Sequence, residues 1–220
     1  MEYRFVKTFE FNFNFGTLLS VELGTYSESD SLVNSTEEIF NEIKDCVINR
    51  GIPELIWFKA IGDSLKYANS TKIIKLIKEE YPNQQIGIYL NCALFEYEED
   101  CKDFYDCDVV AINLNSVNPY NFSKINKCPE SVSPLGILKG IEDFRKEFNG
   151  KLGIYTMFLK GVNDNIGNVE DLKNFLLKVM PDHYSVSDYT LNGFKPVSDK
   201  FKKKLKETLR DLPFEVIYTF

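Results

Sequence analysis

The sequence is poor in the groups that enzymes commonly use for acid–base and metal chemistry. It contains a single histidine, His183, among 220 residues. One histidine excludes a multi-histidine metal site, and a Ser-His or Cys-His nucleophile would have to use that one residue. The chain also lacks GxGxxG and GxxxxGKS/T sequences. The glycine-rich turns that bind dinucleotides or nucleoside triphosphates are therefore absent.

Cysteines are few and dispersed, at positions 46, 92, 101, 107 and 128. An odd number of cysteines without an export signal predicts free thiols rather than a disulfide framework. The N-terminal segment has no continuous apolar core typical of a signal peptide. No apolar run approaches the ~20 residues that a membrane span needs. We therefore expect a cytoplasmic protein that does not associate with membranes.

The composition is that of a folded domain with an acidic surface. Hydrophobic residues make up 44% of the chain and charged residues 27%, with a formal net charge of -7. One dense basic run lies near the C-terminus, at Lys200, Lys202, Lys203, Lys204 and Lys206. On a helix such a run is typical of a solvated face. Because the chain as a whole is acidic, we do not expect RNA as a partner.

Short apolar runs alternate with amphipathic segments along the chain. The apolar runs predict strands over 55–58, 86–91, 109–114, 152–159, 184–189 and 214–220, after an alternating N-terminal strand over 9–15. The segments between them predict helices near 35–51, 70–82, 133–148, 168–179 and 196–211. Ser133 followed by Pro134 is a typical helix start, and Gly51 is a typical helix end.

This alternation predicts an α/β fold with a parallel sheet. An eight-unit barrel needs ~31 residues per unit, so the chain has room for six or seven units. We expect a partial (β/α)6 TIM-type barrel of mainly parallel strands, forming a single domain over residues 1–220. A doubly wound sheet is the competing architecture, but it usually has a glycine-rich turn after its first strand.

In both folds, ligands bind at the C-terminal ends of the strands. Five polar residues at or just after predicted strand ends are therefore candidate ligand-binding residues: Asp63, Asn91, Asn113, Asn115 and Lys160. Asparagine hydrogen-bonds ligands well but is a poor acid or base. The alternative is that these residues cap helices and close turns, as Asn and Asp commonly do.

Three sequences between residues 108 and 164 resemble the central part of radical S-adenosylmethionine (SAM) proteins, in the branch near the tRNA wyosine-synthesis enzymes. They are the Phe-Ser-Lys-Ile-Asn segment at 122–126, Phe-Arg-Lys-Glu-Phe at 144–148, and Met-Phe-Leu-Lys-Gly-Val-Asn-Asp at 157–164. The resemblance implies a (β/α)6 partial barrel. It also implies a CxxxCxxC motif in the loop after the first strand, where three thiolates hold a four-iron cluster that binds SAM.

The motif itself is missing. The Val21-Glu-Leu-Gly24 segment resembles the sequence that surrounds the third cysteine, and counting back places the three ligand positions at Asn14, Leu18 and Val21. None of these residues is a thiol. The Gly-Glu-Pro sequence of the family corresponds here to residues 62–64, Gly-Asp-Ser. We therefore expect no iron–sulfur cluster, no metal site and no catalytic residues for radical chemistry.

The resemblance leaves three functions to weigh. An RNA-contacting module, based on the wyosine-like resemblance and the basic C-terminal run, is disfavoured by the acidic net charge. Of the other two, the first is a non-catalytic binding or partner subunit, with an active radical SAM enzyme as its protein partner. The second is a cluster-free enzyme or small-molecule binder that holds SAM or a nucleotide in the residual pocket at the top of the barrel. No cofactor is expected, although SAM can bind such a pocket without a cluster.

Overall fold

The computed structural model describes residues 6–12, 16–23, 36–60, 70–102, 104–126, 132–190 and 195–220. The chain divides into two compact units, the first formed by residues 1–90 with 103–110 and the second by 91–102 with 111–220. The expectation of a single domain over residues 1–220 stays a prediction.

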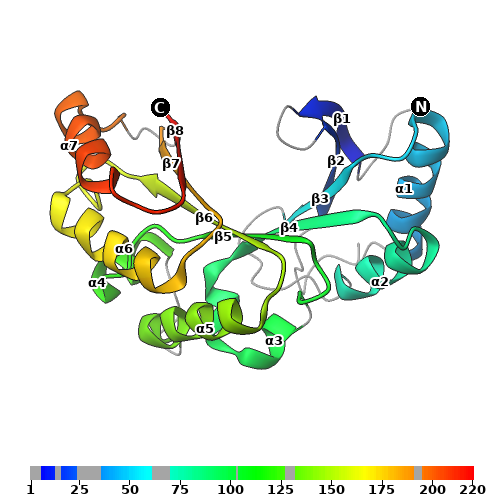
Figure 1. The fold of residues 1–220 in the computed structure, drawn as a ribbon, viewed down its shortest axis with the longest axis horizontal. Coiled ribbons are helices and arrows are strands. Elements are labelled where there is room, and N and C mark those ends of the chain that lie inside the picture. Colours follow the sequence, from blue (N-terminus) through cyan, green and yellow to red (C-terminus); the bar gives the residue numbers. More distant parts are fainter. Residues whose placement is uncertain are drawn as a thin grey trace. The chain divides into compact units, whose positions relative to one another are not determined.

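The first unit is built from strands that pair in sequence order (Figure 1). Its elements are β1 (Val6–Asn12), β2 (Gly16–Leu23), α1 (Thr36–Arg50), β3 (Leu55–Ala60), α2 (Ser70–Glu80) and β4 (Gln85–Asn91). β1 and β2 form an antiparallel pair, and β2 then runs parallel to β3, with Val21 opposite Phe58. β3 runs parallel to β4. The first parallel strand of the sheet is therefore β2.

The helices of this unit follow from apolar residues spaced three and four apart. α1 buries Ile39, Ile43, Cys46 and Val47, and α2 buries Ile73, Ile74 and Ile77. Gly51 ends α1 with a positive φ of 95°, and its N–H donates to the carbonyl of Val47. A residue with a Cβ adopts that conformation poorly, which explains the glycine.

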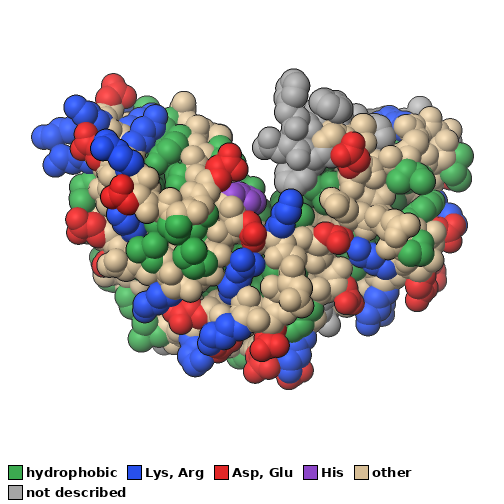
Figure 2. Space-filling view, in the orientation of Figure 1, with side chains coloured by type: hydrophobic (Ala, Val, Ile, Leu, Met, Phe, Trp, Pro, Cys, Tyr) green, Lys and Arg blue, Asp and Glu red, His purple; other side chains and the backbone are tan. Residues whose placement is uncertain are grey.

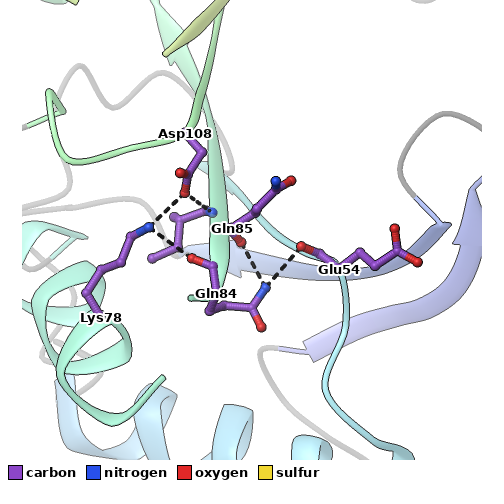
Figure 3. A network of polar contacts seen from close by, with 6 residues as sticks. Glu54, Lys78, Gln84, Gln85 and Asp108 are labelled. Carbon is purple, nitrogen blue, oxygen red and sulfur yellow. Dashed lines mark hydrogen bonds and ion pairs between the residues drawn. The ribbon is translucent and has the colours of Figure 1, made fainter. Parts of the chain in front are cut away.

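A polar network fixes the N-terminal ends of β3 and β4 (Figure 3). The Lys78 ammonium lies 2.8 Å from Oδ2 of Asp108 and 2.9 Å from the carbonyl of Gln84. The same carboxylate oxygen accepts the N–H of Ile86 at 2.8 Å. The buried amide of Gln84 donates to the carbonyls of Glu54 and Gln85. These bonds satisfy backbone groups at an edge of the sheet where ladder partners end.

The second unit contains most of the remaining elements. They are η1 (Cys92–Glu96), α3 (Glu98–Lys102), β5 (Val109–Asn113, which begins in the first unit), α4 (Pro119–Asn126), α5 (Pro134–Glu147), β6 (Lys151–Phe158), α6 (Ile166–Val179), β7 (His183–Asp188), α7 (Asp199–Leu209) and β8 (Glu215–Thr219). β6, β7 and β8 are parallel, with Tyr155 opposite Ser185 and Ser185 opposite Ile217. β8 is the last strand in the order of the sheet.

Alternating burial gives β6 and β7 two different faces. One face is buried and packs toward the helices, since Phe158 contacts Phe201 of α7 in an edge-to-face pair and Asp188 pairs with Lys202. The other face carries half-buried side chains. We call it the open face and define it by Tyr155, Met157, His183, Ser185 and Ser187.

The predicted strands from residue 55 onward and all five predicted helices are confirmed, and Ser133 caps α5 with Pro134 in the first turn. Three features were not predicted: the β1–β2 hairpin and the short helices around η1–α3 and α4. Helices of five to eight residues are too short to show a helical period. Among the described residues, no helix is long and apolar enough to cross a membrane.

Candidate functional site

Four of the five candidate ligand-binding residues are described, and all four lie in the second unit: Asn91, Asn113, Asn115 and Lys160. Asp63 lies outside the described residues, as does Asn14 of the three predicted cluster positions. The part of the predicted pocket that depends on Asp63 therefore stays a prediction. The four described residues differ strongly in what they contact.

Asn115 is hydrogen-bonded within the protein. It lies just after β5, is 4% exposed, and its Oδ1 accepts the backbone N–H of Met157 in β6 at 2.8 Å. Its own backbone carbonyl accepts a hydrogen bond from Nδ2 of Asn163 at 2.8 Å. Asn115 therefore joins the C-terminal ends of β5 and β6, and its side-chain oxygen is not free for a ligand.

Asn163 completes this junction from the loop after β6. The residue is fully buried, and its Oδ1 accepts the N–H of Leu159 at 2.6 Å. Its Nδ2 donates to the carbonyls of Asn115 and Met157, the latter at 3.0 Å. One side-chain amide thus hydrogen-bonds three backbone groups that have no partner in a neighbouring strand. Buried backbone groups need such partners.

Further polar bonds reinforce the same strand ends. The hydroxyl of Thr156 donates to the carbonyl of Leu114 at 2.6 Å. The hydroxyl of buried Ser116 donates to Oδ1 of Asn168, near the start of α6. We define the strand-end network as Asn115, Ser116, Thr156, Asn163 and Asn168. Asn115, Ser116, Thr156 and Asn163 bond backbone groups, so the network is a structural element, whereas the side chain of Asn168 bonds only Ser116 and its Nδ2 is buried without a partner among the described residues.

Asn91 and Lys160 lie at a helix cap and in an exposed turn, respectively. Oδ1 of Asn91 accepts the N–H of Ala93 and caps η1, which matches the capping alternative for this residue. Lys160 is exposed in the turn after β6, where Gly161 has a φ of 79°. Its ammonium pairs with no carboxylate among the described residues.

Asn113 stands apart from its neighbours. It is the last residue of β5, and its side-chain Oδ1 is buried without a hydrogen-bond partner among the described residues. An unsatisfied buried oxygen costs roughly 1–3 kcal/mol, so such groups are rare unless a ligand or water completes them. Asn113 is therefore the predicted site residue whose geometry most favours a ligand.

The open face carries a polar cluster that the sequence did not reveal. Gly153 of β6 lies opposite His183 of β7, and a Cβ at Gly153 would come within 2.4 Å of the histidine Nε2. That nitrogen is 3.3 Å from the hydroxyl of Tyr155, which also hydrogen-bonds Ser185. The only hint in the sequence was the glycine that pairs with the single histidine, but that pairing is known only once the register of β6 and β7 is known.

Burial sets the ionisation of this pair. It lowers the pKa of His183 below its ordinary value, against the opposing effect of Glu215 and Asp182, and Lys151 lowers it slightly further. Burial likewise raises the pKa of Tyr155. At neutral pH the pair is therefore uncharged, able to donate and accept hydrogen bonds but not to bind anions by charge.

The two described cluster positions, Leu18 and Val21, lie inside a strand. Leu18 and Val21 belong to β2 rather than to the loop that follows it, and Val21 is fully buried. Since they are three positions apart in a strand, their side chains point to opposite faces of the sheet. The segment after β2, residues 24–35, contains no cysteine.

The described cysteines do not gather either. Cys46, Cys92, Cys101 and Cys107 are free and buried, in α1, η1, α3 and the turn before β5 respectively. Burial raises the pKa of Cys46, and burial together with the nearby Asp108 raises the pKa of Cys107 to about 12. Among the described residues, no three His, Cys, Asp or Glu side chains could hold a metal ion. Iron–sulfur clusters need thiolate ligands, and the raised pKa values of Cys46 and Cys107 disfavour the thiolate form of these two residues.

A cavity of about 480 Å³ lies in the first unit. It is lined by Ile52, Pro53, Glu54, Tyr81, Pro82 and Gln84, among others. These residues precede β3 and β4, so the cavity is at the N-terminal edge of those strands. In barrel folds that edge generally serves stability rather than ligand binding.

No family model matches the chain. A UPF0026 protein of Helicobacter pylori strain J99 is 26% identical over 148 residues, which are 67% of this chain and 48% of that protein. A UPF0026 protein of Methanocaldococcus jannaschii is 24% identical over 175 residues, 78% of this chain and 52% of the relative. A GTPase Obg of Brachyspira hyodysenteriae is 27% identical over 154 residues, 69% of this chain and 22% of the relative. The chain thus spans about half of these relatives or less.

Solved structures resemble the chain more completely. A radical SAM methyltransferase from Sphaerobacter thermophilus matches 92% of this chain and 66% of its own, with a TM-score of 0.67 and 14% identity. HydG, a maturase of the FeFe-hydrogenase, matches 92% of this chain and 52% of its own, with a TM-score of 0.62 and 14% identity. The chain has the fold of radical SAM enzymes. It is an α/β fold with seven parallel strands, and the predicted partial TIM-type barrel is confirmed.

The strand-end network gives a stability prediction. Asn163→Ala removes one amide and leaves three backbone groups unsatisfied, so it should lower the free energy of unfolding by about 2–4 kcal/mol. Lys160→Ala, three residues earlier and exposed, should change it by less than about 0.5 kcal/mol. Denaturant unfolding followed by circular dichroism measures both. Equal stability of the two variants would show that the network does not hold the strand ends.

The lowered pKa of His183 gives a pH prediction. The unfolded chain binds a proton at His183 as the pH falls below about 6.5, whereas the folded protein resists protonation until lower pH. Wild type should therefore lose stability relative to His183→Gln between pH 7.5 and 5.5. One proton limits the loss to about 1.4 kcal/mol per pH unit, and the partial exposure of the ring reduces it further.

Carboxylate titrations are shared by wild type and His183→Gln, so the difference between their unfolding free energies isolates the histidine. A difference that stays constant with pH, or that favours wild type on acidification, would contradict the burial of a neutral ring. The second outcome would mean that Glu215 and Asp182 dominate its charge state.

Proposed function

We propose that this chain is a radical-SAM-like protein without an iron–sulfur cluster, and that it acts as a binding or partner subunit rather than as a radical enzyme. The radical SAM fold supports the first half of this proposal. The second half rests on the chemistry of the residues available to hold a cluster. Because the matched relatives are longer than this chain, the activity and partners of any larger assembly belong to the proposal as well.

The observation that carries the proposal is the spacing of the cysteines in the sequence. The five cysteines are separated by 46, 9, 6 and 21 positions, so no CxxxCxxC spacing occurs anywhere in the sequence. The segment that follows the first parallel strand has no cysteine, and Leu18 and Val21 diverge to opposite faces of β2. Leucine and valine offer no ligand atom to iron.

A partner subunit does not need the cluster, but it does need an ordered scaffold. The strand-end network supplies that order with neutral side chains and no ionisable group, which suits a structural role better than a catalytic one. The natural partner under this proposal is an active radical SAM enzyme. A complex between the two would place chemistry on the partner and binding on this chain.

A small-molecule binder is the second candidate function. The unsatisfied Oδ1 of Asn113 favours it, because this atom lies at the strand edge where ligands of such folds bind. SAM or a nucleotide is the ligand class to test, without a cluster. Calorimetric titration of the iron-free protein with SAM distinguishes the two functions. A small-molecule binder whose site includes Asn113 should release heat on SAM binding, and the Asn113→Ala variant should lose that heat.

Anaerobic reconstitution with iron and sulfide tests the main proposal. We expect less than about 0.2 iron per chain after desalting and no visible absorbance from sulfur-to-iron charge transfer, because the sequence has no CxxxCxxC set of thiolates. An active radical SAM enzyme treated in parallel provides the positive control. Stoichiometric iron with that absorbance, lost when cysteines are replaced by serine, would refute the proposal.

A further inference from the structure

We propose that β8 and the lysines of α7 form a docking surface for an acidic, extended segment of a partner protein. We call it the α7–β8 surface and define it by Lys202, Lys206, Tyr218 and Phe220, together with Lys203, which is exposed on α7 three positions before Lys206. This inference goes beyond the proposed function, since it does not depend on whether the chain holds a cluster. It rests on three independent features of the second unit.

The first feature is an unpaired strand edge. β8 pairs with β7 on one side and is the last strand in the sheet order, so within the described residues no strand pairs with its other side. Such an edge presents free backbone N–H and C=O groups that can accept another strand. Val216, Ile217 and Tyr218 are only half-buried along it, and Phe220 is 41% exposed.

The second feature is the position of two lysines over the aromatic rings of this strand end. The Lys202 ammonium lies 4.8 Å from the ring centre of Phe220, and that of Lys206 lies 5.1 Å from the ring centre of Tyr218. Lys202 is held in place by Asp188, 2.8 Å away and largely buried. Asp188 compensates the charge of Lys202, so the positive charge offered beside this strand end is that of Lys206, which pairs with no carboxylate among the described residues.

The third feature is charge contrast. Lysine side chains gather over α7 in Figure 2, although the whole chain has a net charge of -7. Positive charge beside a free strand edge complements acidic side chains on an added strand. Backbone pairing would supply affinity, and alternate side chains would supply specificity, as in other cases of strand addition.

The same charges argue against two other occupants. A second copy paired across a twofold axis would bring the α7 lysines of both copies toward one another. Single-stranded RNA binds by stacking bases on open aromatic rings. Here lysine ammonium groups already lie over the rings of Tyr218 and Phe220. An acidic polypeptide is compatible with both observations.

Fluorescence anisotropy with a labelled octapeptide of alternating Glu and Val tests the surface. The peptide should bind wild type, and Lys203→Glu/Lys206→Glu should weaken its binding about tenfold or more. The control is Lys72→Glu/Lys75→Glu on the exposed face of α2, which changes the net charge equally. It should change affinity less than about twofold. Circular dichroism of both double variants checks that each is folded.

A second peptide separates strand addition from simple charge attraction. Replacing its two central valines by proline removes backbone donors and should abolish binding. Equal binding of the proline peptide, no binding of the first peptide to wild type, or equal loss in both double variants would overturn the proposal. So would tighter binding of oligo(U), or self-association of wild type that excludes the peptide.

Discussion

The second unit depends on one buried side chain, the amide of Asn163. Three backbone groups end without ladder partners where β5 and β6 leave the sheet, and this amide satisfies all three. In a buried position each unpaired group would cost free energy comparable to a lost hydrogen bond. Asn163 thereby ties the loop after β6 to Asn115 and to the end of β6, whereas Asn165 caps the start of α6. The polar residues at this edge of the unit therefore serve mainly to stabilise the fold.

This constraint explains why the sequence predicted the fold better than the site. Strand and helix periods depend on apolar spacing, so α1 and β6 could be predicted from their own residues. The hairpin of β1 and β2 could not, because where a strand ends and reverses depends on its partners. The partial barrel followed from the strand–helix rhythm together with the unit length.

The site residues illustrate the limit more sharply. Asn113 and Asn115 are two positions apart and chemically identical, yet the buried Oδ1 of Asn113 has no partner among the described residues and that of Asn115 is bonded to Met157. Asparagine suits turns, caps and ligands alike, so residue type alone cannot separate these roles. His183 shows the opposite case. Its pairing with Tyr155 needs the register of β6 against β7, which no local pattern encodes.

The central claim is that the polar strand-end residues hold the scaffold rather than a ligand. Hydrogen exchange of the backbone amides of Met157 and Leu159, measured by NMR without added ligand, tests it most directly. Both amides donate only to asparagine side chains at this edge, so the account predicts opening free energies close to that of global unfolding. The amide of Gly161, bonded in an exposed turn, should exchange much faster. Rapid exchange at Met157 and Leu159 that slows only when a ligand is added would contradict the account.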